Sequence, residues 1–184
     1  MKIIQHLCLL RELKSKIAKS HGRLYRMAYA WGHDPDLAQD LAQETMEKAL
    51  KQLSQLRDPE KLDSWMFGIL NNCWHDHFRR QRNLLDINDI TELKHEDTPE
   101  ALHDRQDIVS SVRYSIARLP ANQRYVVTLV DIEGFSYAEV ATILDIPTGT
   151  VMSRLSRARK QLANYLLDYK VETQAKPTKL RRIV

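Results

Sequence analysis

The sequence predicts an all-α protein: two small helical domains joined by an acidic linker, the C-terminal one a helix-turn-helix domain. Glycine (5 of 184 residues) and proline (6) are too scarce for a fold of many short strands and tight turns. Apolar residues recur every three or four positions in several stretches, which is the period of an amphipathic helix. The acidic stretch 86–107 lacks this period and separates two groups of predicted helices.

Composition and charge exclude several classes of protein. The chain is 28% charged and 43% hydrophobic, as in a soluble globular protein, and its net charge of +4 is compatible with a nucleic-acid partner. Two cysteines, Cys8 and Cys73, are too few for a disulfide scaffold and fit a reducing compartment. The apolar runs near the N-terminus are too short for a signal sequence or a membrane span, so we expect a cytoplasmic protein.

Charge is segregated along the chain. Residues 1–33 carry seven basic residues against one acidic, and residues 151–184 carry nine against two. Residues 86–107 carry eight acidic residues against two basic ones. Such alternating blocks predict several distinct surfaces. The predicted organisation is an N-terminal domain over 1–83, a linker over 84–107, a helix-turn-helix domain over 108–170 and a basic, poorly ordered tail over 171–184.

The N-terminal domain holds two helices whose polar faces are candidate sites. Asp34 and Pro35 predict a helix start, with Asp34 as N-cap. The polar face of that helix carries Asp36, Asp40, Gln43 and Glu44. The next helix has a wide apolar face from Leu62 to Phe78. On its other face we place Phe67, Asn71, Asn72, His75, Asp76, Arg79 and Arg80.

Aromatic residues of this second helix have two possible roles. Trp65 and Trp74 could be wedges that open a DNA duplex, but both lie on the apolar stripe, so core packing is favoured. Phe67 lies off the stripe and is the better candidate for contact with an unstacked base.

The C-terminal domain has the order of a helix-turn-helix unit. Pro120 ends one helix, and the next helix, over 121–132, closes at Gly134. Ser136 and Glu139 form a capping box for a short helix over 137–144. A turn over 145–147 leads to a long basic helix, which we expect Thr148 to cap. Such a helix enters the major groove, where it would present Thr148, Thr150, Met152, Ser153, Arg154, Ser156 and Arg157. The alternative is a plain helical hairpin with a solvated basic face.

Sites of other chemistry are not favoured. Cys73, His75 and His77 resemble a metal cluster, but only Cys73 and His77 share a helix face, and no CxxC motif is present. The sequence contains no Gly-rich phosphate loop, no nucleophile elbow and no paired catalytic carboxylates. We therefore expect no enzymatic activity, no metal, no cofactor and no small-molecule substrate.

Five stretches of the sequence carry a family resemblance. The segment DLAQDLAQETMEKA, over 36–49, resembles the helix of bacterial sigma-70 family factors that docks on the clamp coiled coil of RNA polymerase. The segment from Ser64 to Arg80 resembles their −10 segment. The pair Leu119-Pro120 and the runs FSYAEVA and GTVMSRLSRAR resemble their −35-binding domain. The chain is identified as a member of the extracytoplasmic-function (ECF) class of that family.

This resemblance implies a function and a set of sites. The chain would be a promoter-specificity subunit that binds the β and β′ subunits of core RNA polymerase and helps melt promoter DNA, for a stress or envelope-signal regulon. The resemblance assigns core docking to Asp36, Asp40, Gln43 and Glu44. It assigns −10 recognition to Phe67, Asn71, Asn72, Asp76, Arg79 and Arg80, and −35 recognition to the positions named above on the last helix. It also implies a cognate anti-sigma factor, often membrane-bound in this family.

Three residues depart from the family pattern. Met152 stands where a basic residue is usual, Ser156 where a larger residue such as His is common, and Asn71 where Arg is common. We expect Arg157 to read a base and Arg154 to contact a phosphate. The linker's acidity either aids solubility or lets the linker thread a basic polymerase channel.

Two alternative functions are weighed against a promoter-specificity subunit. The first is a conventional helix-turn-helix regulator with a helical sensor domain, and the second is a helical adaptor that binds only protein. The promoter-specificity subunit is favoured by Asn72, Asp76 and the Arg79/Arg80 pair, because a sensor domain has no reason to resemble a segment that reads the −10 element.

Overall fold

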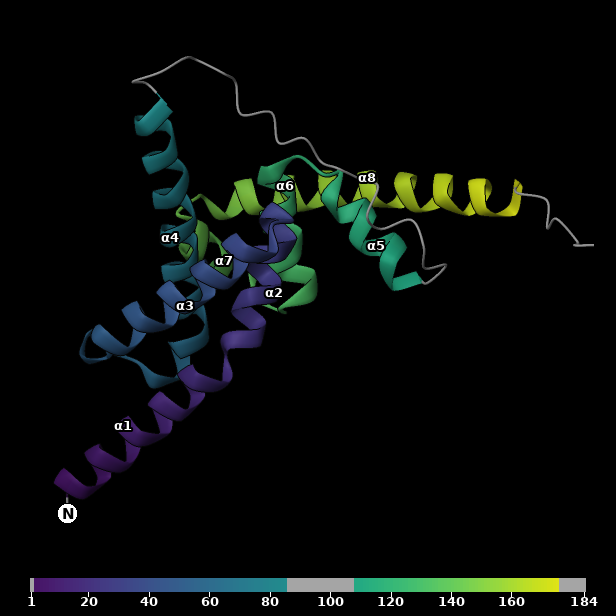
Figure 1. Ribbon diagram of the computed structural model, residues 1–184. Coiled ribbons are helices and arrows are strands. Elements are labelled where there is room, and N and C mark those ends of the chain that lie inside the picture. The colour runs from purple at the N-terminus through teal and green to yellow at the C-terminus, as the bar shows by residue number, and fades with distance from the viewer. Residues whose placement is uncertain (1, 86–107, 176–184) are drawn as a thin grey trace, which may run out of the picture.

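The computed structural model describes residues 2–85 and 108–175, and this part of the chain is helical, without a strand (Figure 1). The helices of the N-terminal half are α1 (Lys2–Lys19), α2 (His21–Gly32), α3 (Pro35–Lys51) and α4 (Leu62–Leu85), with short 3-10 turns at Leu53–Gln55 and Pro59–Lys61. The C-terminal half has α5 (Ile108–Ala117), α6 (Ala121–Val127), the π-helical turn η4 (Thr128–Ile132), α7 (Tyr137–Leu144) and α8 (Thr148–Ala175). The all-α prediction is confirmed.

Local capping signals explain where two of the helices, α3 and α7, begin. The Asp34 carboxylate accepts hydrogen bonds from the backbone N–H groups of Asp36 and Leu37, as expected of an N-cap. Ser136 and Glu139 form the predicted capping box at the start of α7. Thr148, however, is not the N-cap of α8. The backbone carbonyl of Pro147 accepts from the N–H groups of Thr150 and Val151, so α8 begins one residue earlier than predicted.

Three further element boundaries differ from the prediction. The helix expected over 121–132 changes to π geometry at Thr128, whose hydroxyl donates to the backbone carbonyl of Arg124. Helix α4 continues to Leu85, and α8 continues to Ala175, five residues into the predicted tail. Residues 86–107 of the predicted linker and 176–184 of the predicted tail lie outside the described residues.

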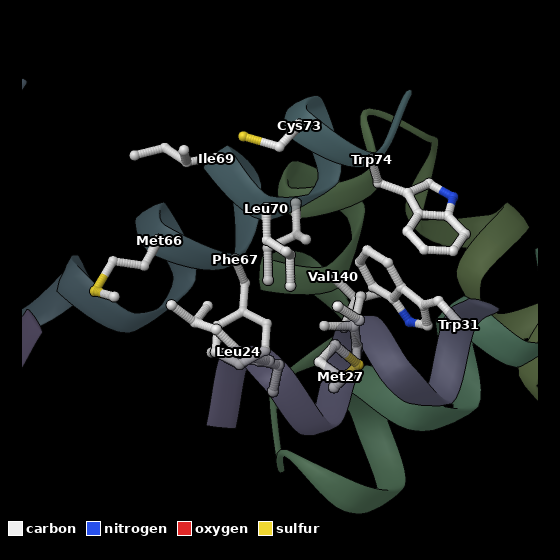
Figure 2. Close-up of a cluster of buried hydrophobic side chains, with 14 of the residues drawn as sticks. Leu24, Met27, Trp31, Met66, Phe67, Ile69, Leu70, Cys73, Trp74 and Val140 are labelled. Atoms are coloured by element: carbon white, nitrogen blue, oxygen red, sulfur yellow. The ribbon is translucent and has the colours of Figure 1, made fainter. Parts of the chain in front are cut away.

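The buried core is continuous between the two halves of the chain. Figure 2 shows Leu24, Met27 and Trp31 of α2 beside Leu70 and Trp74 of α4, with Val140 of α7 in the same cluster. The core continues into α8 through Val151, Leu155 and Ala158. The predicted inward positions Val151 and Leu155 are thus confirmed.

Long helices extend beyond this core at both ends of the chain. In Figure 1, α1 projects to one side of the body and the C-terminal part of α8 to another. Leu7 of α1 is 59% exposed and Leu167 of α8 is 62% exposed. Neither helix, nor any other in the described ranges, is long and apolar enough to cross a membrane.

Candidate DNA-reading and polymerase-docking surfaces

The predicted docking residues gather on one face of α3. Asp36, Asp40 and Gln43 are exposed, while Ala38, Leu41 and Ala42 of the same helix are buried in the core. Glu44 is half-buried, and its carboxylate pairs with Lys48 Nζ at 2.8 Å. The hydrogen bond from Lys48 to Glu44 raises the pKa of the Lys48 amine, so this lysine stays charged. The result is an acidic surface that suits a basic partner helix.

Lys48 also connects this face to the interior. Its Nζ donates a hydrogen bond of 3.4 Å to Sγ of Cys73, which is buried. Burial raises the pKa of the Cys73 thiol, so the sulfur is held in its neutral, unreactive form. No group of three metal-ligating side chains lies together within the ranges 2–85 and 108–175.

The predicted −10 residues on α4 fall into two sets. Asn72, Arg79 and Arg80 are exposed, and Asp76 accepts a hydrogen bond of 2.7 Å from Arg79 Nη2. These four residues form a polar surface along the C-terminal half of α4. An amide and two guanidinium groups on such a surface are suited to bind base edges and phosphates.

Phe67 and Asn71 are not on that surface, and their predicted exposure is wrong. Phe67 is 1% exposed and Asn71 is 4% exposed. The Phe67 ring packs edge-to-face on Phe135, with ring centroids 5.0 Å apart. Asn71 lies one turn further along the same face of α4. The helical period placed Phe67 correctly off the main stripe, but the partner that buries it comes from the other half of the chain.

The tryptophans of α4 behave as core residues. Trp74 is 3% exposed, and its indole Nε1 donates a hydrogen bond of 3.0 Å to the hydroxyl of Tyr125 in α6. Trp65 is half-buried against the core. Core packing, the favoured interpretation, is confirmed for Trp74.

The predicted −35 residues lie along the N-terminal turns of α8. Thr148, Met152, Ser153, Ser156 and Arg157 are exposed, whereas Thr150 and Arg154 are half-buried. The Arg157 side chain is folded back along the helix. Its Nε donates to the Ser153 carbonyl at 3.1 Å, and its Nη2 donates to the Ser153 hydroxyl at 3.3 Å.

Contacts between the two halves were not predicted at all. Arg23 Nε pairs with Glu133 at 2.9 Å, and Trp31 Nε1 donates to Thr128 Oγ1 at 3.0 Å. Arg124 Nη1 donates to the Trp31 carbonyl at 2.9 Å. No local motif marks Arg23 or Glu133, so the sequence offered no signal for this pair. Among the apolar partners, only the burial of Phe67 could have been suspected, because a large aromatic on a polar face needs cover.

Comparisons with known proteins cover both halves. Residues 17–84 match the family Sigma-70 region 2, and residues 110–162 match Sigma-70, region 4. The RNA polymerase sigma-H factor of Pseudomonas aeruginosa is 30% identical over 157 residues, which are 79% of this chain and 81% of the relative. The ECF RNA polymerase sigma factor EcfG of Rhodopseudomonas palustris is 30% identical over 157 residues, which are 84% of each chain.

Solved structures show the same fold. The sigma factor RpoE of Bartonella quintana, solved in complex with the anti-sigma factor NepR, matches with a TM-score of 0.69 at 24% identity, covering 85% of this chain and 97% of that one. CnrH, solved in complex with the cytosolic domain of CnrY, matches with a TM-score of 0.59 at 24% identity, covering 88% and 96%.

The two matches decide between the functions considered. The Sigma-70 region 2 match occupies the part of the chain where a sensor domain would lie, so a conventional regulator and a protein-only adaptor are not favoured. Both regions occur in the order that the sequence motifs predicted. The chain therefore belongs to the sigma-70 family of RNA polymerase sigma factors, in the extracytoplasmic-function class.

Proposed function

We propose that this sigma subunit docks on core polymerase through the acidic face of α3, reads the −10 element through α4 and reads the −35 element through α8. The observation that carries the proposal is the exposure of three chemically different polar surfaces on three separate helices. The surface of α3 is acidic, that of α4 combines an amide with two arginines, and that of α8 combines hydroxyls with arginine. A sigma subunit needs three such surfaces, whereas an enzyme needs one convergent site.

Core docking is proposed to use Asp36, Asp40, Gln43 and Glu44. Carboxylates spaced by one helical turn can each accept a charge-assisted hydrogen bond from an arginine of a partner helix. Because Glu44 pairs with Lys48, Asp40 is the acidic group at the centre of the face that has no internal partner among the described residues. Asp40 is therefore expected to contribute more than Glu44 to the affinity for core polymerase.

The partners and setting of the protein follow from this proposal. Transcription initiation places the chain with core polymerase and promoter DNA in the cytoplasm, and it requires no catalytic group, metal or cofactor in the chain itself. Regulation by a cognate anti-sigma factor is also proposed, because the sigma factor RpoE, a protein of the same fold, was solved in complex with an anti-sigma factor.

A charge-reversal experiment tests the docking surface. The double variant Asp40→Lys, Glu44→Lys should lower affinity for core polymerase by about tenfold or more, because like charges then face a basic partner. Glu12→Lys is a matched control, since Glu12 is an exposed helical acid that also pairs with a lysine four residues on, Lys16, at 3.0 Å. Wild-type affinity in the double variant, with unchanged helix content, would reject this surface.

Transcription tests the function as a whole. Core polymerase with and without the chain is supplied with total genomic DNA, and the 5′ ends of the transcripts are mapped. A promoter-specificity subunit produces a set of start sites that depend on the added chain and share two upstream elements. A protein that binds DNA or polymerase without directing initiation leaves the start sites unchanged.

A further inference from the structure

One large apolar side chain stands on the surface that α8 is proposed to turn toward DNA. Met152 is 54% exposed, whereas Val151 and Leu155 of the same two turns are buried in the core. A single exposed methionine is ordinary on a protein surface. This one, however, lies among the residues proposed to read the −35 element, so its chemistry bears on which base the helix prefers.

The exposed side chains around Met152 are all small. On an α-helix, the surface neighbours of a residue lie three and four positions away. The exposed ones here are Thr148, Gly149 and Ser156, and a Cβ at Gly149 would meet no atom within 4 Å. Ser153, the next residue along the chain, donates its hydroxyl to a backbone carbonyl of the preceding turn at 3.1 Å. Met152 is therefore the longest side chain on this part of the helix surface and projects beyond its neighbours.

Two arginines flank this surface, and both are engaged in the free chain. Arg159 follows Met152 by two helical turns, and its guanidinium is held on Asp131 at 2.6 and 3.1 Å. Arg157 lies on the other side of Ser153 and donates to that residue. Met152 itself carries no charge and no hydrogen-bond donor. It can therefore neither neutralise a phosphate nor donate a hydrogen bond to a base edge.

The major groove offers one partner that suits a projecting apolar side chain. Hydrogen-bond donors and acceptors line the base edges there, and thymine adds an apolar group, its C5 methyl. The unbranched thioether of methionine adapts well to such a contact. We propose that Met152 packs on the C5 methyl of a thymine and so makes α8 prefer an A·T pair at one position of the −35 element. The inference rests on the proposed reading of that element by α8.

Met152 and Arg157 specify different base pairs in this arrangement. Five residues of helix separate them by about 7.5 Å along the axis of α8, whereas one base-pair step is only ~3.4 Å. Met152 is the apolar reader near the N-terminal end of the helix, and Arg157 is the hydrogen-bonding reader more than one turn further on. Removal of a thymine methyl and removal of the Arg157 guanidinium should therefore change the preference at different positions of the element.

Replacement of thymine by uracil tests this contact, because it removes only the C5 methyl and keeps the base pairing. The −35 element is first defined from the start sites mapped with core polymerase and the full chain. Each thymine of the element, on both strands, is then replaced singly by deoxyuridine, and equilibrium competition measures binding by the complex of core polymerase and chain. One replacement should weaken wild-type binding about fourfold, as expected when one buried methyl group is lost. Met152→Ala should bind thymine and uracil equally at that position.

Further variants separate the methyl contact from a general effect on α8. Met152→Leu keeps a long apolar side chain and should retain the sensitivity to uracil. Met152→Ala should leave the salt dependence of binding unchanged, because no phosphate contact is lost. Leu167→Ala is the matched control: Leu167 is an exposed apolar residue of the same helix, 62% exposed, but lies far from its N-terminal turns. Its binding and its sensitivity to uracil should equal those of the wild type.

The outcomes distinguish this inference from the function on which it rests. If the chain directs initiation but no uracil replacement weakens wild-type binding more than twofold, Met152 does not read thymine, and the proposed function stands. The same conclusion follows if Met152→Ala keeps the sensitivity to uracil, or if the −35 element contains no A·T pair. If no start site depends on the chain, the proposed function fails, and the thymine contact falls with it.

Discussion

Trp74 packs so closely over Gly32 that a Cβ at residue 32 would lie 2.6 Å from Cη2 of the indole. Gly32 is the last residue of α2, and Trp74 lies in the middle of α4. The absent side chain therefore lets the two helices bring Trp31 and Trp74 into edge-to-face contact, with ring centroids 5.7 Å apart. The same indole reaches the Tyr125 hydroxyl across the boundary between the halves.

Substitution of Gly32 should consequently destabilise the protein. Gly32→Ala should lower the free energy of unfolding by ~1–3 kcal/mol, because the rigid indole has to shift within a packed core. Denaturant unfolding measures the change. Gly68→Ala is the control, because a Cβ at residue 68 meets no atom within 4 Å. Alanine stabilises a helix interior relative to glycine, so this substitution should raise the free energy of unfolding by ~0.5–1 kcal/mol. Equal effects of the two substitutions would show that the close approach of Trp74 is not important.

Most of the helices could be predicted from the sequence, but the way in which they pack against one another could not. Helical period and capping residues such as Asp34 and Ser136 act within one or two turns, so they can be read locally. The change to π geometry at Thr128 could not be predicted from the sequence. The Thr128 hydroxyl also accepts a hydrogen bond from the Trp31 indole N–H, which belongs to the other half of the chain. A contact between residues 97 apart in the chain leaves no periodic signal.

The same distinction applies to the candidate site. Asn72, Arg79 and Arg80 are exposed as predicted, because a polar side chain on the polar face of a helix needs no partner. Phe67 was misplaced, because Phe135 covers it from a segment that the helical pattern of α4 cannot foresee.

The capping box of α7 should give a pH-dependent contribution to stability. Ser136→Ala should cost about 1 kcal/mol at pH 7, since it removes the hydroxyl that caps the Glu139 N–H. Hydrogen bonds from the Ser136 hydroxyl and backbone N–H lower the pKa of Glu139 below its ordinary 4.5. Because the pKa of Glu139 is lower in the folded state, its carboxylate stabilises the fold at pH values above its pKa in the unfolded chain. This stabilisation is lost as the pH falls through the pKa of Glu139 in the folded state.

Unfolding experiments at two pH values check that sign. The difference in free energy of unfolding between wild type and Ser136→Ala should be largest near pH 7 and should shrink below about pH 4 as Glu139 becomes protonated. Thr142→Ala, an exposed position on the same helix, should show no such trend. A difference that stays constant with pH would mean that the Glu139 carboxylate takes no part in the cap.

Asn72 is predicted to read the −10 element as a melted strand. It is exposed on α4, beyond the covered residues Phe67 and Asn71. An amide can bind the hydrogen-bonding edge of a flipped base, a contact of ~1–3 kcal/mol that forms only once the duplex opens. Asn72→Ala should therefore slow open-complex formation about tenfold or more and leave closed-complex affinity unchanged. His75→Ala, also exposed on α4, is the control. Equal loss at both steps would assign Asn72 a structural role.

Arg157 is predicted to read a base of the −35 element after releasing its internal contacts. In the free chain, two hydrogen bonds hold its guanidinium on Ser153, at 3.1 and 3.3 Å. Both are exposed bonds to neutral groups, so a bidentate contact with guanine would replace them favourably. Arg157→Ala should cost ~1–3 kcal/mol of binding on the preferred sequence and relax the preference at one base pair.

Two further arginines of α8 serve as reference points for interpreting the Arg157→Ala result. Arg154→Ala is expected to weaken binding on every sequence and to reduce the salt slope by about one unit, as the loss of a phosphate contact does. Arg159→Ala should have neither effect, because hydrogen bonds of 3.1 and 2.6 Å hold that guanidinium on Asp131. Binding of the three variants to a set of single-base −35 substitutions separates these roles. If Arg157→Ala shows the uniform loss expected for Arg154→Ala, then Arg157 positions the helix on the DNA backbone, and base reading falls to the hydroxyl groups of α8.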